Sequence, residues 1–241
     1  MKAVIINFFS IQMYLKFNAI KKIFFKYRHL DFSVFLELLN RTKKGKVAFI
    51  QIGASDGITN DPINFFVKKY DWTGTLVEPL PYVFEQLKEN YRSCNNLQFL
   101  NLAVSESNEP LDLYYLPKEF VQDEWQKQLA SFDKRAIEFN LRDYPVLLPK
   151  IATLKVPTAD LKSLFEKTGQ PTTDLFILDV EGYEYNILKQ LTNISHWPDY
   201  IFFEKGTMAP EKLKQLQFFL TEAKYRIYTC GPDDLAVKTF K

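Results

Sequence analysis

The 241-residue chain has few metal-binding and redox-active side chains, since it contains only two cysteines and two histidines. Cys94 and Cys230 form no Cys-x-x-Cys pair, and the histidines are His29 and His196. A structural zinc site needs several such ligands at close spacing, so the sequence argues against one. This sparing use of cysteine fits a reducing, intracellular setting, and we expect a cytoplasmic protein.

The chain also lacks an apolar run long enough to span a bilayer. Residues 3–15 are too few and include Asn7, Ser10 and Gln12. No small-residue cleavage site follows them, which argues against a signal peptide. Two interpretations of residues 1–30 stay open. They form helices that pack on the domain, or they form a basic apolar segment that makes peripheral contact with an anionic membrane.

Charge is distributed unevenly, although the formal net charge is only +2. Residues 1–46 hold ten Lys or Arg and two acidic residues, whereas residues 47–241 hold 21 basic and 27 acidic ones. We therefore expect a basic, apolar helical extension over residues 1–46 and one domain over residues 47–241. The acidic excess of that domain argues against nucleic acid as a partner.

Short apolar runs alternate with helix-compatible segments after residue 46, which predicts an α/β fold with a mostly parallel, doubly wound sheet. The expected strands are residues 47–52, 75–79, 97–104, 175–178 and 200–203, and residues 225–230 and 235–240 should close the sheet as an antiparallel hairpin. Asp61 is expected to cap a helix that has Pro62 in its first position.

Residues 105–155 interrupt this alternation. We expect a strand at 111–116, a charged helix over 123–141, and a strand at 153–156 that could pair with the first one. An insertion of this length near the strand ends is usually functional, so we interpret it as a lid or a substrate-binding wall.

Polar residues follow three of the expected parallel strands, where α/β folds place their ligands. The first strand runs into Gly53 and Gly57, the second ends at Glu78, and the fourth ends at Asp179. Two glycines four apart do not form the G-x-G-x-x-G turn that binds a pyrophosphate. The wider turn suits an adenosyl ligand without phosphates, whose ribose hydroxyls Glu78 could bind.

Five segments in register resemble the FkbM-type family of S-adenosylmethionine-dependent methyltransferases. They are FIQIGASDG, NDPI, WTGTLVEPLP, NLAVS and LDVEGYE, and they span roughly residues 47–204. The resemblance implies a Rossmann-like class I methyltransferase fold, with a seven-stranded sheet whose last strand is antiparallel. It also implies S-adenosyl-L-methionine as cofactor and methyl transfer to a hydroxyl of a sugar, glycan or natural product.

The resemblance implies contacts with the adenosyl half of the cofactor as well. Glu78, followed by Pro79, would bind the ribose hydroxyls, while Leu80 and Ala103 would border the adenine. The acceptor itself is not specified by these residues, and neither is the oligomeric state.

At the methionine half, Gly53, Ala54 and Gly57 would line the cofactor, and Asp179 would face the reacting methyl group. Ser55 and Asp56 belong to the same turn, and Asp56 could equally brace the loop. Gln51 departs from the class I pattern, in which an acidic residue is common at this position. Its amide can still accept one hydrogen bond and donate another.

Three acidic residues are candidates for the base that removes a hydroxyl proton: Asp179, Glu181 and Glu204. They could also hold a divalent metal, which the spacing alone does not establish. Glu181 and Glu184 could instead only stabilise a helix N-terminus.

Two rival functions stay open at this point. A non-catalytic methyltransferase-like module could bind a nucleoside or a partner protein. A nucleotide-sugar-modifying Rossmann enzyme could use Tyr185 and Lys189, but the second phosphate-binding glycine is missing.

Overall fold

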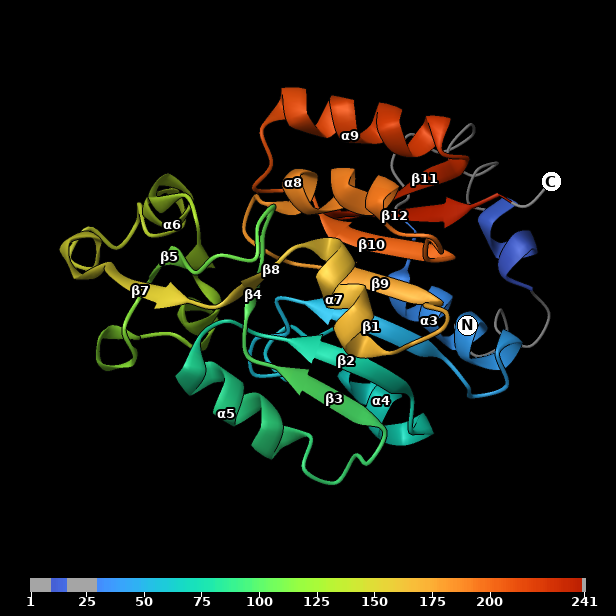
Figure 1. Ribbon diagram of the computed structural model, residues 1–241, viewed down its shortest axis with the longest axis horizontal. Coiled ribbons are helices and arrows are strands. Elements are labelled where there is room, and N and C mark those ends of the chain that lie inside the picture. Colours follow the sequence, from blue (N-terminus) through green and yellow to red (C-terminus); the bar gives the residue numbers. More distant parts are fainter. Residues whose placement is uncertain (1–9, 17–29, 240–241) are drawn as a thin grey trace.

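The computed structural model describes residues 10–16 and 30–239. Seven strands form its central sheet in the order β11-β12-β10-β9-β1-β2-β3 (Figure 1). Their bounds are β1 (Ala48–Ile52), β2 (Thr73–Val77), β3 (Leu97–Leu100), β9 (Leu175–Leu178), β10 (Tyr200–Glu204), β11 (Tyr225–Cys230) and β12 (Asp233–Lys238). Strand β12 runs antiparallel to both β10 and β11, whereas β1, β2, β3, β9 and β10 are parallel. The predicted seven-stranded sheet with an antiparallel last strand is therefore confirmed.

Helices cover both faces of this sheet, which explains why its central strands are apolar on both sides. One face carries α3 (Phe32–Thr42) and α4 (Asn64–Tyr70), and the other carries α7 (Leu161–Thr168), α8 (Glu184–Leu188) and α9 (Pro210–Glu222). Figure 1 shows α7, α8 and α9 in front of the sheet and α3 and α4 behind it. Helix α5 (Pro81–Asn90) lies beside β3 at the sheet edge.

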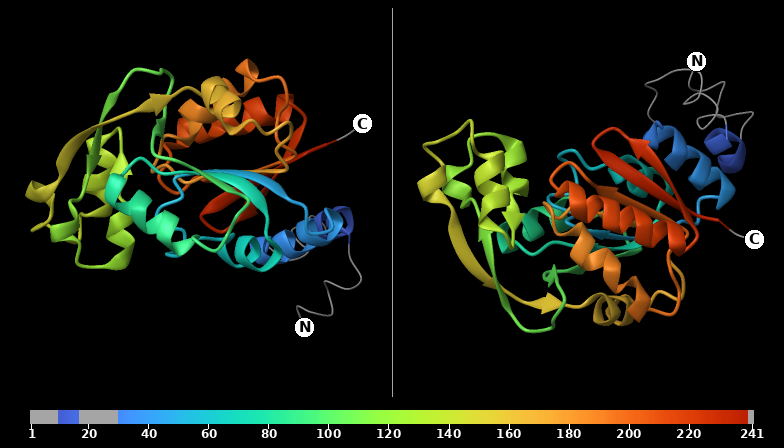
Figure 2. Two further views of the ribbon diagram at one scale, coloured as in Figure 1. Left: turned by 60° about the horizontal axis from the view of Figure 1, so that its bottom comes forward. Right: turned by 90° about the horizontal axis from the view of Figure 1, so that it is seen from above.

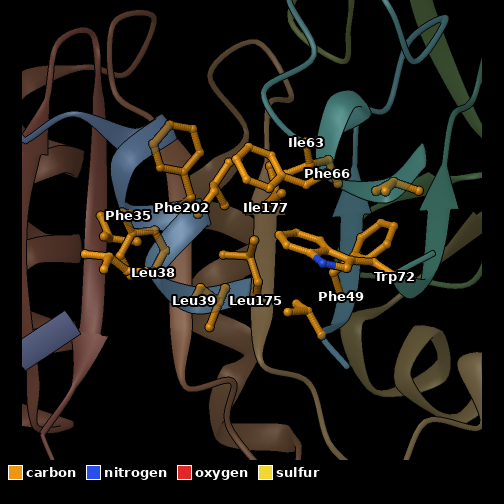
Figure 3. Packing of buried hydrophobic residues seen from close by; sticks show 14 of the residues in the cluster. Phe35, Leu38, Leu39, Phe49, Ile63, Phe66, Trp72, Leu175, Ile177 and Phe202 are labelled. Atoms are coloured by element: carbon orange, nitrogen blue, oxygen red, sulfur yellow. The ribbon is translucent and has the colours of Figure 1, made fainter. Parts of the chain in front are cut away.

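The core on the α3 and α4 face is rich in aromatic residues (Figure 3). Phe32 stacks on Phe202 with ring centroids 3.6 Å apart. The Trp72 indole is buried and its Nε1 donates to Asn40 Oδ1 at 2.8 Å. Alternate residues of each strand enter this cluster and the cluster on the opposite face, as the two-residue period of a strand requires.

The described part of the N-terminal segment packs on this core. Residues 11–16 are helical, and Ile11, Tyr14 and Leu15 are buried in the same cluster as α3. The Tyr14 hydroxyl lies 3.2 Å from the Asp31 carbonyl oxygen, to which it donates. Residues 1–9 and 17–29 lie outside the described residues, so membrane contact through residues 1–30 stays a prediction. Within the described ranges, no helix combines the length and the apolar character that a membrane span needs.

The insertion forms a small layer of its own beyond the strand ends. Its sheet consists of β5 (Leu111–Tyr115), β6 (Ala130–Ser131) and β7 (Ala152–Val156), and β5 pairs antiparallel with β7 as predicted. In Figures 1 and 2 it stands apart from the helices that cover the central sheet, and the arrowheads of β2 and β3 point toward it in Figure 1. The insertion is thus placed at the edge of the sheet where ligands bind.

The single helix predicted over residues 123–141 is wrong. A 3-10 helix, Glu124–Gln128, is followed by β6 and by α6 (Lys134–Asn140). The buried Gln126 side chain accepts from the backbone N–H groups of Gln122 and Asp123, and Asp133 caps α6. These side-chain bonds start each of two short helices, so the segment does not continue as one helix.

Further boundaries differ from the prediction. Strand β2 ends at Val77 instead of residue 79, and β12 begins at Asp233 instead of residue 235. The strand expected over 97–104 breaks after Leu100, because the Asn101 amide donates to the carbonyl oxygens of Glu78 and Pro79. The chain then enters β4 (Ala103–Val104), which pairs with β8 (Thr158–Ala159). Helix α4 begins at Asn64 rather than at Pro62. The Asp61 side chain nevertheless accepts from the N–H groups of Ile63 and Asn64, as a residue that caps a helix start does.

The packing of residues 11–16 can be tested with two neighbouring substitutions. Leu15→Ala should lower the free energy of unfolding by about 2–4 kcal/mol, because it leaves a cavity in the core. Met13, which is 48% exposed on the same helix, is the matched control. Met13→Ala should change that free energy by no more than about 0.5 kcal/mol in urea titrations. Equal values for the two variants would contradict the described packing.

Candidate active site

The loop after β1 is held close to the ends of both neighbouring strands. The N–H groups of Gly53 and Ala54 donate to the Val77 carbonyl oxygen of β2 at 3.0 Å each. Gly53 has φ +77°, and a side chain there would overlap the backbone carbonyl of Asp179 at the end of β9. Gly53 is therefore required by the approach of β1 to β9, in addition to any ligand.

Gly57 and Asp56 stabilise the same loop after β1. Gly57 has φ +70°, and a side chain there would overlap Tyr91 of the α5 terminus. Asp56 accepts from the N–H groups of Ile58 and Thr59 at 2.9 and 2.7 Å and from Lys127 Nζ at 3.1 Å. Burial opposes ionisation of Asp56, but these hydrogen bonds outweigh it and lower its pKa. Neither residue lines the two clefts that adjoin this loop, so both stabilise the conformation of the loop itself.

Glu78 is the buried carboxylate of the first cleft. Its Oε2 accepts from Ser55 N–H at 3.0 Å and its Oε1 accepts from Leu80 N–H at 2.9 Å. Burial, with the nearby charges of Asp179 and Asp56, raises the pKa of Glu78 to about 7. Each oxygen has one protein donor and keeps capacity for a further hydrogen bond.

The first cleft brings together most of the residues predicted for the adenosyl half. The predicted residues that line it are Gly53, Ser55, Glu78, Pro79, Ala103 and Asp179. Leu80 is buried immediately behind, in one cluster with Ala103. The opposite wall comes from the insertion, through Gln128, Ser131 and Phe132, and from Tyr183.

The second cleft opens on the α3 and α4 side of the same loop and shares Gly53, Ser55, Gln128 and Asp179 with the first. It also contains the predicted residues Gln51 and Ala54. Asp61 and Asp233 contribute carboxylates, and Phe32 and Phe202 contribute the stacked pair of rings. The two clefts therefore meet above Gly53 and beside Asp179.

The three candidate bases have different surroundings. Asp179 lies at the junction of the clefts, where protein atoms and the charges of Glu204, Asp233 and Asp61 raise its pKa. Its side chain still reaches water. No group of three His, Cys, Asp or Glu side chains within the described ranges is arranged to hold a metal ion.

Glu181 and Glu204 are more engaged with their neighbours. Glu181 has φ +53° and its Oε2 accepts from Asn140 Nδ2 at 2.9 Å. Burial and the nearby acids, Asp179 first, raise its pKa. Glu204 accepts from Thr207 Oγ1 at 2.8 Å, and burial raises its pKa as well. Glu204 lines neither of the two clefts.

A third groove adjoins the first cleft and shares Ser131, Phe132 and Tyr183 with it. It runs between α6 of the insertion and the segment around α8, with Glu181 and Asn186 in its wall. Phe139, which is 60% exposed, also lines this groove. The groove thus combines aromatic rings with polar and charged side chains, among them Arg135 and Lys212, and such a surface can contact an organic ligand.

The FkbM methyltransferase domain model matches residues 51–227 of the chain. The chain belongs to the FkbM methyltransferase family. Membership makes it a methyltransferase and implies the use of S-adenosyl-L-methionine. Comparison with curated proteins finds no match.

Solved structures with the same fold include a methyltransferase FkbM from Methylobacillus flagellatus KT, with a TM-score of 0.50 and 13% identity. The match covers 80% of this chain and 44% of that chain, so this chain spans less than half of its length. The METTL16 MTase domain has a TM-score of 0.46 at 10% identity, covering 86% of this chain and 68% of that one. Precorrin-6y C5,15-methyltransferase from Geobacter metallireducens GS-15 has a TM-score of 0.40 at 10% identity, and the match covers 84% of this chain and 88% of that one. At 13% identity, the similarity to the methyltransferase FkbM structure shows only that the fold is shared.

The clefts of this FkbM methyltransferase fit an adenosyl amino acid. Gln51 Oε1 and Ser55 Oγ are buried and have no hydrogen-bond partner in the protein. Buried polar atoms are nearly always paired, so both are available to a ligand. Glu78, with its spare acceptor capacity, would hold ribose hydroxyls, and Pro79 and Ala103 would border the base. These cofactor contacts stay predictions.

Sequence reasoning missed the residues that close the clefts. Gln128, Ser131 and Phe132 come from the insertion, which was interpreted as a wall without identifying its lining residues. Asp61 was assigned only a helix-capping role, and Asp233 was read as part of a turn. Their polarity near predicted strand ends was the available signal, but their convergence depends on tertiary packing.

Glu78 is expected to contribute directly to cofactor affinity. Glu78→Gln keeps the shape but removes the charge that would bind the ribose hydroxyls, a loss of about 1.5–3 kcal/mol or roughly tenfold or more in affinity. Calorimetry with S-adenosylhomocysteine measures it, and Glu222→Gln, exposed on α9, is the matched control. Unchanged affinity in a folded Glu78→Gln variant would reject the assignment.

Glu184 predicts a pH-dependent stability. It is fully buried, its Oε1 accepts from Val180 N–H at 2.9 Å, and its Oε2 has no partner. Burial raises its pKa from 4.5 to about 8, so the folded state binds the proton more tightly than the unfolded state. The stabilisation is complete below pH 4.5 and is lost as pH rises to about 8.

Glu184→Gln should remove this part of the pH dependence. Relative to wild type, its free energy of unfolding should rise with pH between 5 and 8, by up to about 1.4 kcal/mol per pH unit. Urea titrations at three pH values measure the difference. A constant difference across that range would show that Glu184 is ionised in the folded protein.

Proposed function

We propose that the chain transfers the methyl group of S-adenosyl-L-methionine to a hydroxyl oxygen of a sugar, glycan or natural-product acceptor. This proposal rests mainly on the position of Asp179, whose carboxylate lies where the two clefts meet beside Gly53. When bound, the cofactor supplies a methyl group made electrophilic by its sulfonium. The protein then has to align donor and acceptor and to accept the hydroxyl proton.

Asp179 is the strongest candidate for the base. Its raised pKa lets it accept a proton at neutral pH and release it afterwards. Glu181 is held by Asn140 and faces the third groove, so it suits orientation of the acceptor. Glu204 is held by Thr207 away from both clefts and would act through the charge of Asp179.

The third groove supports an acceptor with hydroxyl groups. The ring of Phe139 is exposed there, and Asn186 and Glu181 offer polar atoms beside it. A sugar ring combines an apolar face with hydroxyl groups, which matches such a surface. The insertion provides one side of both this groove and the first cleft, consistent with a substrate wall that limits water at the reacting atoms.

A screen of glycans and lipid-linked sugars with labelled methyl donor tests this function. Once an acceptor is found, Asp179→Asn should slow transfer by roughly 10²–10⁴-fold while affinity for S-adenosylhomocysteine changes little. Each enzyme is assayed with and without a chelator. Loss of activity on chelation and recovery with a divalent ion would add a metal to the mechanism.

Full activity of Asp179→Asn would move the role of base to Glu181. Binding of S-adenosylhomocysteine without transfer to any acceptor class would instead favour the non-catalytic module.

A further inference from the structure

We propose that Gln51 and Asp61 bind the amino-acid end of the methyl donor, and that Asp61 is the carboxylate that receives its ammonium group. The inference rests on the proposed use of S-adenosyl-L-methionine. It assigns a binding role to Asp61, whose sequence context indicated only a helix start.

The first argument is an unpaired polar atom at the bottom of the second cleft. Gln51 lies on β1, is only 3% exposed, and lines the second cleft. Its Oε1 has no hydrogen-bond partner. An unpaired buried acceptor lowers stability, and a donor group on a ligand would recover that loss. An ammonium group carries three such donors and no acceptor.

The second argument is the one-sided charge of this cleft. Asp61, Asp179 and Asp233 all line it, and its described lining includes no Lys or Arg. Two lysines outside this lining have partners of their own: Lys127 pairs with Asp56, and Lys205 pairs with Asp234 and donates to the Asp233 carbonyl oxygen. The carboxylates of Asp61 and Asp179 repel each other, so a cationic ligand is favoured between them.

Asp61 is preorganised for this role. Its Oδ1 accepts from the N–H groups of Ile63 and Asn64 at 2.7 and 3.0 Å, which fixes the carboxylate at the start of α4. Its Oδ2 accepts from the Tyr91 hydroxyl at 3.3 Å, a long bond that leaves acceptor capacity. Burial raises the pKa of Asp61 to about 6, and its hydrogen bonds, among them one with the Gln51 side chain, oppose that rise and favour the ionised form. One ammonium group can therefore reach both Gln51 Oε1 and Asp61.

The position of the two clefts gives the orientation of the ligand. Glu78 belongs to the first cleft only, whereas Gln51 and Asp61 belong to the second only. Gly53, Ser55 and Asp179 lie in both. A ligand with a nucleoside at one end and an amino acid at the other would extend across this junction and place its sulfonium near Asp179.

The test compares two ligands that differ only at the amino-acid end. S-adenosylhomocysteine has that end and 5′-methylthioadenosine lacks it. In calorimetry, Asp61→Asn and Gln51→Met should each reduce the ratio of the two affinities by about tenfold, through weaker binding of S-adenosylhomocysteine. Asp112→Asn, exposed on β5, is the matched control and should leave the ratio unchanged.

A ratio within threefold of wild type in either variant overturns the inference. Equal loss of both ligands also overturns it, because Asp61 would then act only through the fold of the loop. If Asp61→Asn fails to fold, Gln51→Met decides alone. Wild-type protein that binds neither ligand would reject the proposed cofactor, an outcome distinct from a failed assignment of Asp61.

Discussion

The contact between Gly53 and the backbone of Asp179 sets the geometry on which the other parts of the site depend. Because residue 53 has no side chain, β1 and β9 end side by side, and the loop after β1 folds directly over the β9 terminus. This closeness places Asp179 in both clefts and brings Glu78 within hydrogen-bond distance of Ser55. The backbone contact therefore fixes the relative positions of Asp179, the proposed base, and Glu78, the residue proposed to bind the ribose.

The second feature of the site is its concentration of acidic side chains. Glu78, Asp179, Glu181 and Glu184 are all crowded or buried carboxyl groups with raised pKa values. Such crowding costs stability in the free protein, so a cation bound among these carboxyl groups would stabilise the fold.

The sequence allowed the sheet and the cofactor loop to be predicted because both depend on local pattern. Short apolar runs such as residues 47–52 that are followed by glycine indicate buried strands, and Gly53 and Glu78 come directly after two of the strands. The break at Asn101 could not be predicted, since it depends on carbonyl groups of residues 78 and 79 that are distant in sequence. The broken helix at 123–141 depends likewise on the burial of Gln126, and the role of Asp61 depends on the position of Gln51 beside it.

The insertion is fastened to both loops that frame the site. Lys127 and Gln128 bind Asp56 and the Thr59 carbonyl oxygen in the loop after β1, at 3.1 and 2.7 Å. Asn140 and Ser131 bind Glu181 in the loop after β9. These contacts couple the insertion to both loops, so any displacement of the insertion would move one wall of the first cleft relative to the loops that carry Glu181 and Asp56.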